Sequence, residues 1–185
     1  ETTLARQQLH LPQSGKMVLI MSGSIGCGPM IQMAMKLLRR LPRDAFVVVI
    51  CGKNKGDLKD LRRIARYSDR LYPVGFTDRM DLYYSAADVA IGKPGGLSCT
   101  ELAQKEVPTV LMLSVPGCES RNLEFFTRYG MALGSENVRE AIKAVRHLLG
   151  NDALRTHMTA AQRTLPHGVT SAIADLIEKG VPPQE

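Results

Sequence analysis

The chain has 185 residues, of which 44% are hydrophobic and 23% charged, so it is long enough to bury a substantial core as one domain. Its longest apolar runs, at residues 17–21 and 45–51, are far shorter than the roughly 20 residues that cross a bilayer, and the N-terminus lacks the apolar stretch of a secretory signal. The net charge is +6, but aromatic residues make up only 5% of the chain and none interleave with its main basic run, which disfavours nucleic acid as a partner.

Apolar and amphipathic segments alternate along the chain, and their periodicity predicts strands and helices in turn. In chain order these are a strand at 16–22, a helix at 29–40, a strand at 45–51, a helix at 56–67, a strand at 70–74, a short helix at 78–86, a strand at 88–91, a helix at 97–105, a strand at 109–113, a helix at 119–129, a short strand at 131–133, and helices at 136–149, 152–163 and 170–179. Continuous apolar strands between amphipathic helices predict an α/β fold with a Rossmann-like, doubly wound parallel sheet.

Positive charge is concentrated around the helix expected at 56–67. Lys55, Lys59, Arg62 and Arg66 fall at helical spacing, with Arg63 beside them. One interpretation is a solvated helix face. The other is an attraction to an anionic membrane surface or an acidic partner, which would make the protein cytoplasmic with a peripheral contact to a membrane.

The cysteines predict neither a metal site nor a disulfide framework. Cys27, Cys51, Cys99 and Cys118 form no C-x-x-C pair, and no cluster of histidines accompanies them, so we expect no zinc site. Their dispersed placement and the lack of an N-glycosylation sequon fit a reducing cytoplasm.

The most informative stretch is at residues 92–101, which follows a short apolar strand and opens a helix. Gly95 and Gly96 let the backbone approach a ligand closely, and the first N–H groups of the helix then point at that ligand with the positive end of the helix dipole behind them. Glu101 follows Ser98 by three residues and is placed to bind a pair of sugar hydroxyls. Phosphate held by backbone and ribose held by a carboxylate describe a nucleotide site. The same Ser98-x-x-Glu101 spacing also fits a capping box, in which Glu101 folds back to its own helix start.

Two common nucleotide motifs are missing. The glycine-rich turn at 22–29 does not spell G-x-G-x-x-G, and the second strand ends in Cys51-Gly52-Lys53-Asn54 without the acid that binds a dinucleotide ribose, so NAD is disfavoured. The chain has no G-x-x-x-x-G-K-[ST] run, which disfavours a P-loop NTPase.

Five segments, at 22–29, 51–55, 74–80, 93–101 and 116–122, together resemble the C-terminal, donor-binding half of the GT-B glycosyltransferases of family 28. The similarity is greatest to the diacylglycerol glycosyltransferases, monogalactosyldiacylglycerol synthase and the processive diacylglycerol glucosyltransferase. The resemblance implies that residues 1–185 are a nucleotide-sugar-binding domain, the C-terminal half of a GT-B fold. It also implies that an N-terminal acceptor domain carrying the general base is absent from this chain, which we take as a trimmed fragment because it begins with Glu1.

The implied reaction transfers a hexose from a UDP-sugar to diacylglycerol and forms a glycolipid. No D-x-D-like motif is present to hold a metal-bound diphosphate, so we expect no metal and no cofactor, and none of the residues is named as catalytic.

The resemblance implies how these residues would hold UDP. The backbone near Phe76 and Thr77 would hold the uracil edge. Glu101 would bind the ribose hydroxyls. The diphosphate would be met by the N–H groups of Gly95, Gly96, Leu97 and Ser98. Phe76 is otherwise most simply read as core packing.

For the donor sugar, the resemblance implies contacts from Glu119 and Asn122, although Asn122 equally fits a hydrogen bond within its own segment. The turn containing Gly23 and Ser24 would face the cleft near the diphosphate and the acceptor. Cys118 stands where the family often has a Gln that contacts sugar hydroxyls. Because a thiol is a poor substitute for an amide, the identity of the hexose stays open.

Two alternatives from other functional classes remain at this point. A UDP-N-acetylglucosamine 2-epimerase would share the fold and the donor but need no acceptor. A standalone donor-binding subunit of a split glycosyltransferase would complete its site on a membrane-bound partner.

Overall fold

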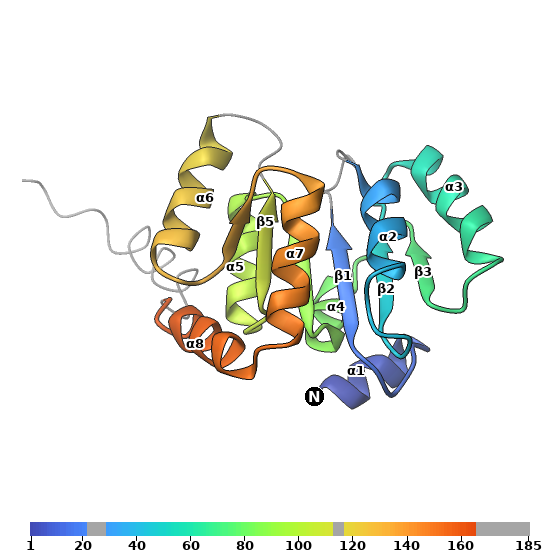
Figure 1. Cartoon of the computed structure of the whole chain (residues 1–185), viewed down its shortest axis with the longest axis horizontal. Helices are drawn as coiled ribbons and strands as arrows, with labels where there is room; N and C mark the ends of the chain where they lie inside the picture. Colours follow the sequence, from blue (N-terminus) through green and yellow to red (C-terminus); the bar gives the residue numbers. More distant parts are fainter. Residues whose placement is uncertain (22–28, 113–116, 166–185) are drawn as a thin grey trace, which may run out of the picture.

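A computed structural model describes residues 1–21, 29–112 and 117–165, and within them one parallel sheet is covered by helices on both faces (Figure 1). The strands are β1 (Met17–Met21), β2 (Phe46–Ile50), β3 (Leu71–Val74), β4 (Val89–Gly92), β5 (Thr109–Met112) and β6 (Leu133–Ser135). The helices are α1 (Thr2–Gln8), α2 (Met30–Leu38), α3 (Lys55–Ala65), α4 (Met80–Ala86), α5 (Gly96–Gln104), α6 (Cys118–Arg128), α7 (Val138–Leu149) and α8 (Asp152–Gln162).

The strands lie in the order β3-β2-β1-β4-β5-β6, and neighbouring strands all pair in parallel. The chain moves outward from β1 to β3 and then returns to place β4 on the other side of β1. The switch point between β1 and β4 opens a crevice at the carboxyl ends of the strands, where sheets of this kind bind ligands. The predicted doubly wound parallel sheet is confirmed.

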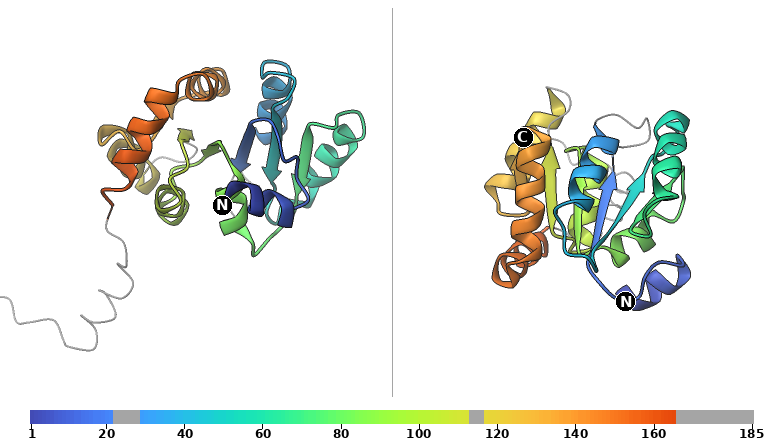
Figure 2. Two further views of the ribbon diagram at one scale, coloured as in Figure 1. Left: turned by 90° about the horizontal axis from the view of Figure 1, so that it is seen from below. Right: turned by 45° about the vertical axis from the view of Figure 1, so that its right-hand side comes forward.

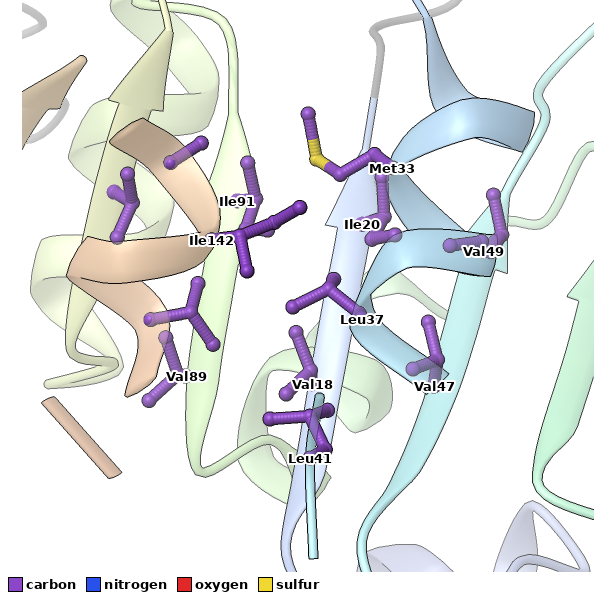
Figure 3. Packing of buried hydrophobic residues seen from close by; sticks show 14 of the residues in the cluster. Val18, Ile20, Met33, Leu37, Leu41, Val47, Val49, Val89, Ile91 and Ile142 are labelled. Carbon is purple, nitrogen blue, oxygen red and sulfur yellow. The ribbon is translucent and has the colours of Figure 1, made fainter. Parts of the chain in front are cut away.

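Side chains of the central strands alternate between two apolar layers. Val18 and Ile20 of β1 share one layer with Leu37 of α2, and Figure 3 shows how closely these side chains pack. Met17 and Leu19 belong to the opposite layer, which includes residues of α1, α4 and α5. Figure 2 shows α2 and α7 on one side of the sheet and α4 and α5 on the other. Successive strand residues point to opposite faces, so a strand buried on both sides must be apolar throughout.

Helix α1 has no counterpart among the elements expected from the sequence. Its Arg6, which is 4% exposed, donates to the carbonyl of Ala86 and, at 2.8 Å, to Oδ2 of Asp88. Asp88 also accepts from Nζ of Lys16 at 2.9 Å and from the N–H of Met17 at 2.8 Å. The contact between Arg6 and Asp88 joins residues 82 positions apart, so no local sequence pattern predicts it.

The sequence predicts a sixth strand at 131–133, and this prediction is wrong by two residues. Met131 and Ala132 are buried, but their N–H groups both donate to the carbonyl of Phe126 and close the end of α6. The strand therefore begins at Leu133. The other elements agree with prediction to within two residues at either end, apart from the helix expected at 170–179, which lies outside the described residues. No helix in the described part of the chain is long and apolar enough to cross a membrane.

Candidate functional site

A cavity of about 230 Å³ lies at the carboxyl ends of β1, β2 and β3, against the start of α5. Its lining includes the sequence-predicted residues Phe76, Thr77, Leu97, Ser98 and Glu101, which come from the loop after β3 and from α5. The volume is below the roughly 300–1,000 Å³ of pockets that take whole drug-sized ligands. The cavity therefore suits one part of an extended ligand, such as a nucleoside, with the remainder lying outside it.

Two large apolar side chains at this cavity are exposed. Phe76 is 68% exposed and Leu97 is 76% exposed. The interpretation of Phe76 as core packing is therefore wrong. Large apolar side chains that are exposed around a cavity, and are not packed in the protein's own core, are typical of a ligand site. The flat ring of Phe76 is suited to contact a planar base.

The start of α5 has the geometry of an anion site. The helix begins at Gly96, and its first internal bond runs from the N–H of Cys99 to the carbonyl of Gly95. The N–H groups of Gly96, Leu97 and Ser98 precede that bond, and no side chain caps the helix. A Cβ on Gly95 would meet no atom within 4 Å, so the space above the backbone is open.

Gly95 itself differs from expectation in one respect. Its N–H, which the resemblance would direct at a diphosphate, donates to the carbonyl of Lys93 at 2.8 Å. This bond closes a tight turn immediately before α5. The amide donors at the mouth of the helix are therefore those of residues 96–98.

Glu101 does not cap its own helix. Its Oε2 accepts a hydrogen bond from the phenol of Tyr84, with an oxygen–oxygen distance of 2.8 Å, and no side chain bonds the N-cap of α5. The capping-box interpretation of Ser98 and Glu101 is therefore wrong. Both Tyr84 and Glu101 line the cavity.

Tyr84 is a site residue that the sequence analysis missed. It lies on α4, is 4% exposed, and belongs to the apolar layer between the sheet and α4. Burial, followed by the hydrogen bond to Glu101, raises the pKa of its phenol above the ordinary value. In the sequence it looks like one more apolar-face residue of a helix, and nothing local indicates its partner.

Two bonds join the beginning of α6 to the loop before α5. Nζ of Lys93 forms an ion pair with Oε1 of Glu119 at 2.8 Å. Nδ2 of Asn122 donates to the carbonyl of Pro94 at 2.9 Å, so the interpretation of Asn122 as bonding within its own segment is wrong. Glu119 and Asn122 thus lie beside the anion site, with Asn122 Nδ2 3.7 Å from an ideal Cβ on Gly96.

Three sequence-predicted positions cannot be placed in the same way. Gly23 and Ser24 lie outside the described residues, as does the side chain of Cys118. Two described thiols are buried, and burial raises the pKa of Cys51 to about 11 and that of Cys99 to about 12, which keeps both protonated at neutral pH. Across the described ranges, no three His, Cys, Asp or Glu side chains are grouped as metal ligands.

A larger hollow, of about 850 Å³, shares Met80, Tyr84 and Glu101 with the cavity and extends along α4 and α5 to α1. Asp78, Asp81 and Glu106 contribute carboxylates to its lining. Such a lining repels an anion, so an anionic ligand is better served by the cavity at the start of α5.

Both the sequence and the fold match known proteins. The family model for the glycosyltransferase family 28 C-terminal domain matches residues 17–122. The processive diacylglycerol beta-glucosyltransferase of Bacillus pumilus is 30% identical over 174 residues, covering 91% of this chain and 45% of that protein. Among crystal structures, MurG of Acinetobacter baumannii matches with a TM-score of 0.73 at 22% identity, covering 95% of this chain and 53% of the other. A complex of S. aureus MnaA with UDP matches with a TM-score of 0.72 at 18% identity, covering 94% and 47%. The chain thus spans about half the length of the proteins it matches.

Proposed function

The chain belongs to the family of glycosyltransferase family 28 C-terminal domains, and we propose on this basis that it is the donor-binding half of a UDP-sugar-dependent glycosyltransferase. The observation that carries the proposal is the cavity at the start of α5. There an exposed aromatic ring, a carboxylate and the helix-start residues Leu97 and Ser98 line one opening, directly after Gly96 at the start of α5.

These groups divide the work of holding UDP. The loop at Phe76 and Thr77 holds the uracil, and Glu101 accepts hydrogen bonds from the ribose hydroxyls. The diphosphate lies over the amides of residues 96–98, where the positive end of α5 stabilises the charge that develops as UDP leaves. No metal or cofactor is needed for this division of roles. Glu119 and Asn122, which bond to Lys93 and to the carbonyl of Pro94 beside this anion site, would contact the sugar.

The acceptor is the second part of the proposal. One relative, from Bacillus pumilus, is a processive diacylglycerol beta-glucosyltransferase, and this chain covers 45% of it. The complete protein would transfer a hexose from a UDP-sugar to diacylglycerol and so make a glycolipid. The general base belongs to an N-terminal acceptor domain, so residues 1–185 alone bind the donor without turning it over.

Calorimetry and a turnover assay test this proposal together. We expect the chain to bind UDP and UDP-glucose but not ADP, and to form no glycolipid from diacylglycerol. The complete protein should form it. Failure to bind UDP would overturn the donor role, and robust turnover by residues 1–185 would overturn the division into two domains.

Conversion of UDP-N-acetylglucosamine to its manno epimer by the complete protein would favour the epimerase alternative instead. If the encoding gene lacks an in-frame acceptor domain, a standalone subunit is favoured.

We also propose that the α2–α3 edge of the sheet contacts an anionic membrane surface. Residues 30–70 hold eleven lysines and arginines against four aspartates and glutamates, a net charge of +7 in a chain whose total is +6. Lys59, Arg62 and Arg66 of this segment are exposed, and Tyr67 just beyond α3 is 90% exposed. Basic clusters beside an exposed aromatic ring suit the charged headgroup region of a bilayer.

Charge reversal tests the membrane contact. The double variant Lys59→Glu/Arg62→Glu should bind vesicles of 30% phosphatidylglycerol several-fold more weakly than the parent chain, with the loss shrinking at high salt. The control Arg139→Glu/Lys143→Glu, on exposed positions of α7, changes the net charge equally and should bind like the parent. Equal binding by both double variants would contradict a role for α3.

A further inference from the structure

We propose that Tyr84 is a positioning residue: it holds the Glu101 carboxylate in place for the ribose and so makes the site select a ribonucleotide over its 2′-deoxy form. This inference rests on the proposed function, and it concerns a residue that neither the sequence motifs nor the family resemblance singled out.

The phenol of Tyr84 is held firmly by its surroundings. The side chain is 4% exposed and packs in the apolar layer that also contains Met17, Leu19 and Leu102. Its hydroxyl lies 2.8 Å from Oε2 of Glu101, and the hydrogen bond links α4 to α5. A buried ring has little freedom to move, so the position of its hydroxyl is set by the core rather than by the ligand.

Glu101 has other partners available, and the bond to Tyr84 decides between them. On α5 it could turn toward the open helix start, or toward Lys105 four residues later, a spacing that favours an ion pair. In the structure Lys105 instead pairs with Glu1, with the nitrogen and oxygen 3.6 Å apart. With Oε2 engaged by Tyr84, the carboxylate faces the cavity, and its second oxygen and remaining lone pairs can accept hydrogen bonds from a ribose diol.

The chemistry of the phenol suits this role. Burial and the neighbouring carboxylate raise the pKa of Tyr84, so the proton remains on the phenol at neutral pH and the group donates continuously. A carboxylate fixed in this way loses a hydrogen-bond partner when the ligand lacks the 2′-hydroxyl. Sites built to bind a hydroxyl reject analogues without it far better than apolar pockets discriminate by size.

The test measures the affinity of the chain for UDP and for 2′-deoxy-UDP by calorimetry. The parent chain should prefer UDP by about tenfold or more. Tyr84→Phe should weaken UDP binding by about five- to tenfold, should change binding of 2′-deoxy-UDP by no more than about twofold, and should reduce the preference to about twofold. The matched control is Tyr83→Phe, which removes the hydroxyl of the adjacent buried tyrosine of α4, a residue that does not line the cavity. Tyr83→Phe should leave both affinities unchanged.

Thermal unfolding of both variants checks that they remain folded. A Tyr84→Phe variant that weakens both ligands equally, or that keeps the parent's preference, would overturn the positioning role while leaving the proposed donor function intact. A parent chain that binds UDP without preferring it to 2′-deoxy-UDP would overturn it as well. A parent chain that binds neither ligand would overturn the proposed function itself.

Discussion

Glu101 carries the most specific part of the proposed nucleotide site, and it is the carboxylate that lines both the cavity and the larger hollow beside it. Its bond to Tyr84 removes the capping role and leaves ligand binding as the use that fits its position. Replacing Glu101 with Ala should therefore weaken UDP binding by about 1.5–3 kcal/mol, the range for a hydrogen bond to a charged group. Calorimetry measures this directly.

Glu124, an exposed carboxylate of α6, is the control for that change. Glu124→Ala removes the same charge without touching the cavity and should bind UDP like the parent chain. Unchanged affinity in Glu101→Ala would remove the ribose role.

Asp88 ties α1 to the start of β4 through Arg6. It accepts from buried Arg6, from Lys16 and from the N–H of Met17. In Asp88→Ala the buried side chain of Arg6 would lose its counter-ion, so the free energy of unfolding should fall by about 3–5 kcal/mol. Urea denaturation followed by circular dichroism measures the change.

The ion pair of Asp60 with Arg63 provides the contrast. Both side chains are exposed, at 49% and 74%. Asp60→Ala should change the free energy of unfolding by less than about 1 kcal/mol. Equal losses in the two aspartate variants would show that burial of Arg6 does not set the value of its pair.

The amides at the start of α5, the helix dipole and the preceding turn all favour an anion at the same place. Gly95 has φ −73° and ψ 135°, a conformation open to any residue, and its Cβ position faces empty space. Gly95→Ala should therefore leave the melting temperature nearly unchanged. It should weaken UDP binding about tenfold, because the methyl group would occupy the space from which the proposed diphosphate would approach.

Gly56→Ala, in the first turn of α3, is the matched change at another helix start and should leave UDP affinity as it is in the parent. A Gly95→Ala chain that binds UDP normally would move the diphosphate away from residues 95–98. Loss of stability instead of affinity would assign Gly95 a purely structural role.

Local pattern predicted the elements well where one segment carries its own signal. The loop before α5 was predictable because Gly95 and Gly96 follow an apolar strand and precede a helix. Helix α1 was not, because Arg6 finds Asp88 across 82 positions. The role of Tyr84 at the site could not be predicted for the same reason, because its partner lies 17 residues away on another helix. The sixth strand was predicted two residues too early, because Met131 and Ala132 are apolar and buried as strand residues would be. Their N–H groups instead bond to the end of α6.

Across the whole molecule, the site and the basic segment share part of the sheet, since Ile50 and Gly52 of that segment line the cavity. The switch point between β1 and β4 brings the ends of β1, β2 and β3 toward α5, and this placement forms the cavity. The segment from α2 to α3 holds the excess positive charge at one edge of the sheet. A donor site at the strand ends and a basic edge beside them would let the protein bind a soluble nucleotide-sugar while it rests on a lipid surface.

A crystal structure of the chain with UDP would show whether the nucleotide binds over the start of α5. We expect diphosphate oxygens within hydrogen-bond distance of the amides of residues 96–98, uracil against Phe76 and Thr77, and the ribose on Glu101. Density for UDP elsewhere on the molecule, or an empty cavity at saturating UDP, would contradict it.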